Sequence, residues 1–90
     1  MTEGETWRWV MLSAARRDLR QLDRRWADRI LGEIDRLAAL PARTDTRKLA
    51  GRSEQWRLRV GDYRVIFTTE PEERLITVLR IGHRRDIYRV

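Results

Sequence analysis

The chain has 90 residues and no cysteine, and its 20 lysines and arginines against 14 acids give a net charge of +6. This length predicts a single domain, residues 1–90, with one modest hydrophobic core. The lack of cysteine excludes a disulfide framework and thiolate metal sites, and one histidine leaves little for zinc to bind. We therefore expect no metal and no cofactor.

The N-terminal segment MTEGETWRWV has no basic stretch followed by an apolar one. No apolar run approaches the ~20 residues that a membrane-spanning helix needs. These two observations predict neither a signal peptide nor a membrane span, and we expect a cytoplasmic protein.

The positive charge is distributed unevenly along the chain. Residues 1–41 carry a net charge of +1, whereas residues 42–90 carry +5, and all but one of the 20 cations are arginines. A basic half favours a polyanionic partner, either nucleic acid or an acidic protein segment. Arginine favours planar, two-pronged contacts with phosphate, although a GC-rich genome would also produce this bias towards arginine.

The first third of the chain predicts a strand followed by two helices. Trp7–Leu12 is a short β-prone segment, and residues 1–6 before it form a polar tail. Apolar residues then recur at steps of three and four, which is typical of helices, here over residues 14–22 and 24–40. Ser13 and Asp23 stand where N-caps are expected, and Pro41 ends the second helix.

The second half predicts three strands. Residues 41–54 form a polar connection with Leu49 as an apolar anchor. Trp56–Val60 and Tyr63–Thr69 then form a hairpin around Gly61-Asp62. Pro71–Glu73 makes the next turn. Leu75–Ile81 is almost wholly apolar, as expected for a central strand covered on both faces, and Gly82 ends it before the basic tail His83–Val90.

The predicted order is β-α-α-β-β-β. We expect an α+β fold in which an antiparallel sheet packs against an N-terminal helical hairpin. At their positions in the strand and helix patterns, Trp7, Trp9, Trp26 and Trp56 are expected to pack in the core rather than stack on RNA.

The arginines of the second half are the candidate functional residues. No glycine-rich phosphate loop, metal-ligand cluster or catalytic triad is visible in the sequence. Alternation places Arg57 and Arg59 on one face of their strand and Leu58 and Val60 on the other. Cleavage of RNA needs a base, stabilisation of charge at phosphorus, and an acid, and arginines can supply the second. Tyr88 and His83 are suited to proton transfer, but a solvated basic face explains the same pattern.

Three segments together resemble the RelE/ParE toxin superfamily of type II toxin–antitoxin systems. The segments are Lys48-Leu49-Ala50-Gly51, the hairpin Trp56-Arg57-Leu58-Arg59-Val60-Gly61-Asp62-Tyr63-Arg64-Val65-Ile66-Phe67, and the tail Ile81-Gly82-His83-Arg84-Arg85-Asp86-Ile87-Tyr88-Arg89. The first-helix segment Ser13–Leu22 is similar to that family too, and the resemblance spans about residues 7–89. It implies the RelE-like fold.

For the ribonuclease branch, the resemblance implies metal-independent cleavage of mRNA in the ribosomal A site. The positions that match its functional residues predict that Arg64 and Arg84 hold the scissile phosphate. Tyr88 or His83 would transfer protons. The residues expected to bind other parts of the RNA are Arg57, Arg59, Arg85 and Arg89.

Two departures from the family pattern affect this assignment. Some members have lysines where this chain has Gln55 and Arg57, and Phe67 replaces a frequent tyrosine. Because an arginine is a poor general base, proton transfer falls more heavily on Tyr88 and His83.

Three functions stay open at this point. The first is a ribosome-dependent mRNA endonuclease, whose partners are the ribosome and mRNA. The second is a ParE-like toxin that binds and poisons DNA gyrase without ribonuclease activity, and the third is a non-toxic relative that binds only its antitoxin. The presence of Arg64, Arg84 and Tyr88 together favours the first. In all three we expect a hetero-oligomer with a cognate antitoxin whose segment neutralises the arginines.

Overall fold

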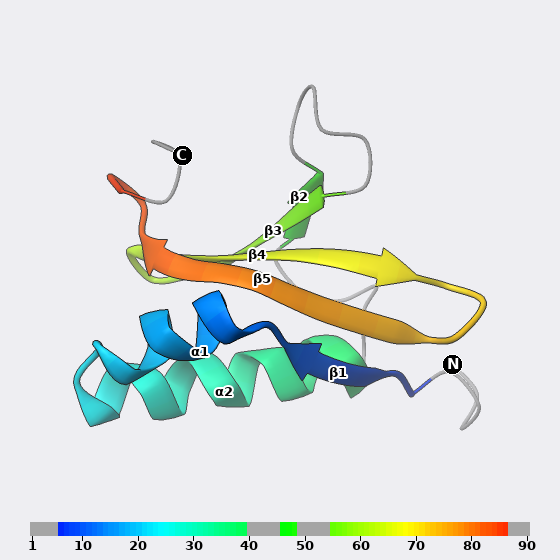
Figure 1. The fold of residues 1–90 in the computed structure, drawn as a ribbon, viewed down its shortest axis with the longest axis horizontal. Coiled ribbons are helices and arrows are strands. Elements are labelled where there is room, and N and C mark those ends of the chain that lie inside the picture. Colours follow the sequence, from blue (N-terminus) through cyan, green and yellow to red (C-terminus); the bar gives the residue numbers. More distant parts are fainter. Residues whose placement is uncertain (1–5, 40–45, 49–54, 87–90) are drawn as a thin grey trace.

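The structure is a computed structural model of the chain, and it describes residues 6–39, 46–48 and 55–86. Two helices lie side by side beneath a twisted sheet (Figure 1). In chain order the elements are β1 Arg8–Met11, α1 Ser13–Arg20, α2 Arg24–Ala39, β2 Thr46–Lys48, β3 Gln55–Val60, β4 Tyr63–Glu70 and β5 Leu75–His83. The α+β class and the placement of both helices on one face of the sheet are confirmed.

The sheet is mixed rather than wholly antiparallel. Its strand order is β1-β5-β4-β3-β2, and every neighbouring pair is antiparallel except β1 and β5, which run parallel. Tight turns join β3, β4 and β5, and such turns force antiparallel pairing. The helical hairpin and the later strands separate β1 from β5 in the chain, so this pair is free to run parallel.

One strand was missed in the predicted polar connection 41–54. Thr46–Lys48 forms β2, which pairs with Leu58, Arg57 and Trp56 of β3. Three residues are too short to show an alternating pattern, and the hydrogen-bonding edge of β3 decides their conformation. Leu49, the expected anchor, lies outside the described residues.

Of the two predicted N-caps, Asp23 is confirmed and Ser13 is wrong. Asp23 caps α2, because the backbone N–H of Trp26 donates to Asp23 Oδ1 at 3.1 Å. Ser13 is not a cap: Leu12 occupies the N-cap position of α1 and Ser13 is already helical. The helix ends at Arg20, two residues before the predicted end.

Strand β5 differs from the prediction at its end and in its burial. It continues through Gly82 to His83, and a bulge opposite Ile66/Phe67 leaves Leu79 outside the register. The side of β5 that faces the helices is buried, and it carries Ile76, Val78 and Ile81. The partly exposed residues of β5 include Leu75, Thr77, Leu79 and Arg80. The helices therefore cover this strand on one face only.

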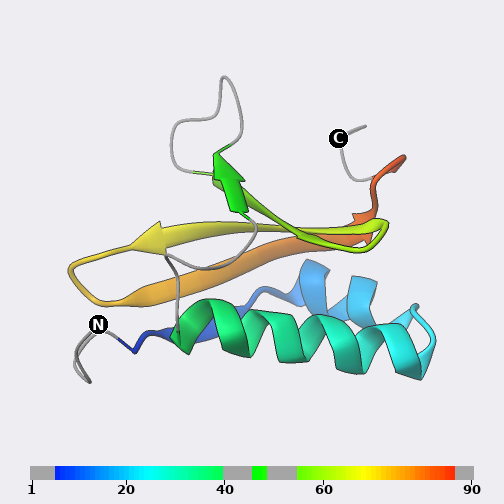
Figure 2. The ribbon, with the colours of Figure 1, turned by 180° about the vertical axis from the view of Figure 1, so that it is seen from behind.

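The core lies between α2 and the sheet, as the view from behind shows (Figure 2). Ile30 and Ile34 of α2 are fully buried against Leu58, Val65 and Val78. All four tryptophans pack around this cluster, which confirms the expected core role. Within the described residues, no helix is both long and apolar enough to cross a membrane.

Candidate nucleic-acid interface

Four arginines share the face of the sheet that turns away from the helices. Residues directly opposite one another on paired strands point to the same face. Across β3, β4 and β5, two such rows are Arg57–Ile66–Arg80 and Arg59–Arg64–Gly82, and the row between them is the core row Leu58–Val65–Ile81. We call Arg57, Arg59, Arg64 and Arg80 the arginine face. The predicted separation of Arg57 and Arg59 from Leu58 and Val60 is confirmed.

Arg64 is the buried member of the arginine face. Only 9% of the residue is exposed, and its Nη1 donates to the carbonyl oxygens of Gly61 and Tyr63, at 2.9 Å each. Its Nε is buried and has no hydrogen-bond partner within the described structure. A buried donor without an acceptor costs about 1–3 kcal/mol. Arg64 is therefore held in place by the turn while one of its donors lacks a partner.

His83 does not lie with Arg64. Its register partner is Tyr63, in the row that begins with Val60, so its side chain is on the helix-covered face. The rings of Tyr63 and His83 meet edge to face with centroids 5.8 Å apart. His83 Nδ1 accepts the backbone N–H of Arg85 at 3.2 Å. This bond occupies the lone pair of Nδ1 and ties the His83 ring to the backbone of the tail.

The turn between β3 and β4 positions the start of the C-terminal tail. Gly61 has φ +59°, and a Cβ built there would lie 2.7 Å from Cη2 of Trp26, so glycine is required for both conformation and space. The carbonyl oxygen of Asp62 accepts the backbone N–H of Arg84 at 2.8 Å. The exposed side chains of Arg84 and Arg85 thus follow a fixed backbone. Tyr88 and Arg89 lie outside the described residues.

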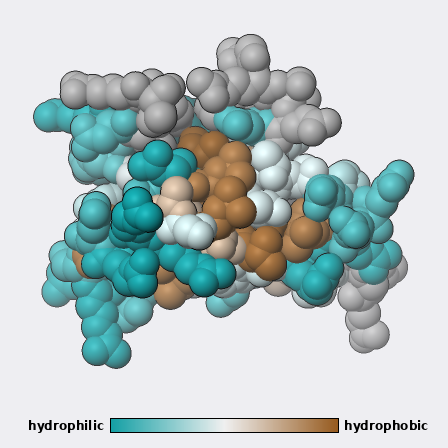
Figure 3. Space-filling view, viewed as in Figure 1, coloured by the Kyte–Doolittle hydropathy of each residue, from teal (hydrophilic) through white to brown (hydrophobic). Residues whose placement is uncertain are grey.

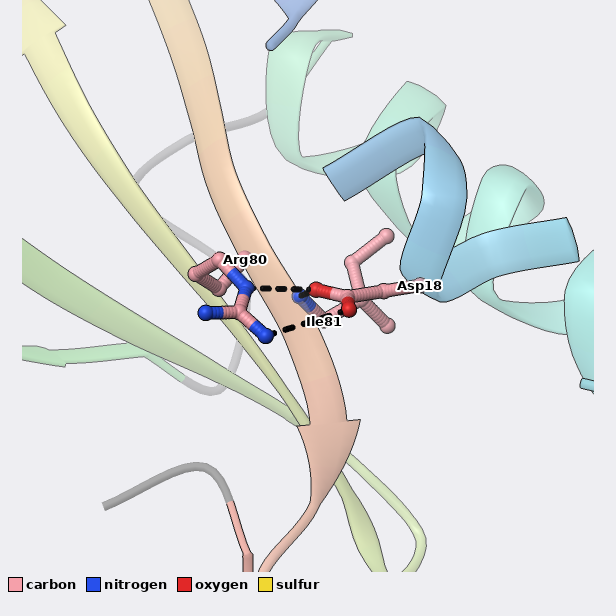
Figure 4. Close-up of polar contacts among 3 residues, drawn as sticks. All are labelled: Asp18, Arg80 and Ile81. Carbon is pink, nitrogen blue, oxygen red and sulfur yellow. Dashed lines mark hydrogen bonds and ion pairs between the residues drawn. The ribbon is translucent and has the colours of Figure 1, made fainter. Parts of the chain in front are cut away.

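An ion pair between Asp18 and Arg80 at the end of β5 was not predicted. Asp18 of α1 accepts Nε of Arg80 at 2.8 Å, Nη2 of Arg80 at 3.2 Å, and the backbone N–H of Ile81 at 2.9 Å (Figure 4). The hydrogen bonds that the Arg80 side chain donates to Asp18, and then the negative charge of Asp18, raise the pKa of Arg80 above its ordinary value. The partners are 62 positions apart, and no local pattern in the sequence connects them.

Hydrophobic surface crosses the middle of the molecule, where β5 and β1 run in Figure 1, and hydrophilic surface surrounds it (Figure 3). Val10 and Leu12 are large apolar residues that stay exposed, at 45% and 47%. An apolar patch with a charged border is typical of a site for a protein partner. In the ranges that the structure covers, no group of three His, Asp or Glu side chains could hold a metal ion.

The family model for the ParE toxin of type II toxin–antitoxin systems matches residues 10–88. The chain belongs to this toxin family. The match covers nearly the whole chain and confirms the resemblance to the RelE/ParE superfamily seen in the three motifs. No curated protein matches the toxin's sequence.

Solved structures of RelE toxins resemble this toxin over most of its length. The toxin–antitoxin complex RelBE2 from Mycobacterium tuberculosis contains a chain that is 24% identical, with a TM-score of 0.78, covering 87% of this toxin and 98% of that chain. The archaeal RelE–RelB complex from Pyrococcus horikoshii OT3 is 28% identical, with a TM-score of 0.75 and coverages of 90% and 98%. The isolated E. coli RelE toxin is 15% identical, with a TM-score of 0.72 and coverages of 86% and 83%. The RelE-like fold is thereby confirmed.

Proposed function

We propose that this toxin is a ribosome-dependent mRNA endonuclease that cleaves mRNA in the A site without metal. The observation that carries the proposal is Arg64, a buried guanidinium on a face with three other arginines, whose Nε lacks an acceptor within the described structure. A phosphate oxygen would supply that acceptor once the side chains that cover Nε move aside. A fixed cation in a water-poor position stabilises charge on phosphorus more strongly than a mobile one in water.

The arginines would divide the binding of the RNA backbone among them. Arg64 and Arg84 hold the scissile phosphate, and Arg57 and Arg59 bind flanking phosphates together with Arg85 and Arg89. Attack by the 2′-hydroxyl on phosphorus then breaks the bond to the 5′-oxygen, so one fragment ends in a 2′,3′-cyclic phosphate and the other begins with a 5′-hydroxyl. Tyr88 is the proposed proton-transfer group at the phosphate. His83 faces the other side of the sheet and its Nδ1 accepts the backbone N–H of Arg85, so its proposed part is to hold the start of the tail rather than to transfer a proton at the phosphate.

An antitoxin is the proposed protein partner, in a hetero-oligomer. The relatives from Mycobacterium tuberculosis and Pyrococcus horikoshii were solved as complexes of RelE with RelB. An acidic, amphipathic segment would neutralise the arginine face and cover Val10 and Leu12. The proposed location is the cytoplasm, where ribosomes translate mRNA.

The test is to add purified toxin to an in vitro translation reaction and map the mRNA ends by primer extension. We expect new 5′ ends at codons that occupy the A site, and none when ribosomes are omitted. Addition of the cognate antitoxin should abolish them. Intact mRNA in a reaction whose translation stops would contradict the proposal.

The alternative is a ParE-like toxin that binds and poisons DNA gyrase. One observation favours it: the family model that matches is described as ParE. A gyrase reaction with relaxed plasmid separates the two functions, because a gyrase poison leaves linear DNA after protein digestion and an mRNA endonuclease does not. A chain that neither cuts mRNA nor traps gyrase, and does not arrest growth, would be the non-toxic relative.

A further inference from the structure

The free edge of β5 is closed by a side chain rather than by a strand. Strand β1 pairs with β5 only as far as Val78, so the described backbone beyond it has no strand neighbour on that side. Asp18 takes this place, because its Oδ2 accepts the N–H of Ile81 at 2.9 Å. The same carboxylate also accepts two hydrogen bonds from Arg80.

Asp18 fixes the position of the Arg80 guanidinium. Its two oxygens accept Nε and Nη2 in a two-pronged geometry, and only 15% of the Asp18 side chain is exposed. These bonds use two of the five N–H donors of Arg80. Figure 4 shows the third guanidinium nitrogen pointing away from Asp18, and 43% of the Arg80 side chain is exposed. The remaining donors are therefore aimed outward from an already ordered side chain.

Arg80 extends the arginine face to the edge of the sheet. It shares a row with Arg57, with Ile66 between them. A cleft of about 380 Å³ opens beside it, between the end of α1 and the end of β5, and Leu22, Tyr63, Gly82 and His83 are among its lining residues. This volume lies within the ~300–1,000 Å³ of pockets that hold small ligands, and it suffices for one nucleotide.

We propose that Arg80, positioned by Asp18, binds a phosphate of single-stranded RNA, and that the cleft at the edge of β5 receives the attached nucleotide. This inference rests on the proposed RNA substrate. The Asp18–Arg80 pair is neutral as a whole, but its carboxylate lies on the inner side and its remaining N–H donors on the outer side. A ligand outside meets the positive end of the pair. Because the guanidinium is already ordered, binding does not have to order its side chain.

The probe is a fluorescent 2′-O-methyl RNA oligonucleotide, which lacks the 2′-hydroxyl needed for cleavage and so reports binding alone. Affinity is measured across a salt series for the wild type and for Arg80→Ala. We expect Arg80→Ala to bind several-fold more weakly. The slope of log affinity against log salt should fall by about 0.7, the value for one phosphate of a single strand that is no longer neutralised. The control is Arg36→Ala, which removes an exposed arginine paired with Glu33 on α2 and should leave the slope unchanged.

Asp18→Asn separates positioning from simple charge. Removal of a negative charge should strengthen RNA binding if only net charge matters. The asparagine retains an oxygen for the N–H of Ile81 but loses the ion pair with Arg80, so we expect binding to weaken several-fold. Arg80→Lys keeps the charge without the two-pronged geometry, and it should retain the salt slope while losing affinity.

The inference is overturned if Arg80→Ala keeps the wild-type salt slope, if folded Asp18→Asn binds RNA as tightly as the wild type, or if the wild type fails to bind the oligonucleotide at low salt. If Asp18→Asn does not fold, the salt slope of Arg80→Ala decides. Cleavage is scored separately in the translation reaction. A chain that binds through Arg80 without cutting would contradict the proposed function and leave this site intact.

Discussion

At the scale of single residues, Arg64 combines burial with an unpaired donor. Its Nη1 bonds to Gly61 and Tyr63 make it part of the turn, whereas its Nε would gain a partner from a bound ligand. Most buried polar groups in proteins are paired, and an exception calls for an explanation, of which a functional role is one. This distinguishes Arg64 from Arg59, its exposed neighbour in the same row.

Replacement of Arg64 with Met tests that distinction. We expect mRNA cleavage to fall by about 100-fold or more, as when a charge-stabilising donor is removed. The free energy of unfolding should change by less than about 1.5 kcal/mol, because the lost bonds to two carbonyls are partly offset by removal of the unpaired Nε. Urea unfolding and primer extension measure the two effects. If the variant cleaves mRNA at the wild-type rate, Arg64 is not part of the catalytic site. If the variant unfolds, the role of Arg64 is structural.

The tail residues make a second prediction at this scale. Arg84→Ala and Tyr88→Phe should each abolish growth arrest upon expression, because one loses a phosphate ligand and the other a proton-transfer group. Both should still bind the antitoxin in a pull-down, since each changes a single side chain. If both variants still arrest growth, the proposed catalytic site is misplaced.

At the scale of elements, the β3–β4 turn joins several parts of the proposed site. The carbonyl oxygen of Gly61 accepts a hydrogen bond from the Arg64 guanidinium, and that of Asp62 accepts the backbone N–H of Arg84. Gly61 also packs on Trp26 of α2. Trp26 in turn contacts Tyr63 with ring centroids 4.9 Å apart. Strain in this turn would therefore reach the arginine face and the tail together.

Gly61→Ala and Gly32→Ala form a matched pair for this element. At Gly61 the added Cβ meets Trp26 and the left-handed φ is unfavourable for alanine, so we expect the free energy of unfolding to fall by about 2 kcal/mol. At Gly32, inside α2, nothing lies within 4 Å of the added Cβ. Alanine there should raise the free energy of unfolding by about 0.5–1 kcal/mol. Urea unfolding measures both changes. Equal effects at the two positions would contradict this account of the turn.

The start of α2 gives a further prediction. Asp23→Ala removes the cap on the N–H of Trp26 and should lower the free energy of unfolding by about 1 kcal/mol. Asp28→Ala is the control, because Asp28 forms an exposed pair with Arg24 at 3.9 Å and should matter less. Thermal melts measure which of the two substitutions lowers the melting temperature more.

At the scale of the whole molecule, the net charge of +6 acts in two opposite ways. Repulsion among the arginines destabilises the free toxin, whereas the same charges attract a polyanion. Burial of the hydrophobic patch and neutralisation of the arginine face by one partner would relieve the repulsion and cover the apolar surface at once.

Salt should therefore move stability and binding in opposite directions. Between low salt and about 0.5 M NaCl, screening of about 0.5 kcal/mol of repulsion should raise the melting temperature of the free toxin by about 2–4 °C. RNA binding should weaken over the same range. Differential scanning fluorimetry and the oligonucleotide assay measure the two trends. A melting temperature that falls with salt would mean that favourable ion pairs outweigh the repulsion.

Local periodicity was enough to determine the fold class, the order of the main elements and the side of β3 on which Arg57 and Arg59 lie. Alternation assigned Arg57 and Arg59 to one face of β3, and helical spacing with Asp23 located α2, because these features depend on residues near one another in the chain. The motifs at residues 48–51, 56–67 and 81–89 were enough to indicate the family that the family model then showed.

Only the tertiary structure decided the features that depend on pairing between distant segments. The edge of β3 makes a strand of Thr46–Lys48, and β1 runs parallel to β5. Because β5 continues through Gly82, the alternation carries His83 to the opposite face from Arg64, whereas the motifs alone predict both at one site. The burial of Arg64 and its hydrogen bonds to the turn depend on how the strands and helices pack. The ion pair between Asp18 and Arg80 depends on the same packing, which no local pattern in the sequence encodes.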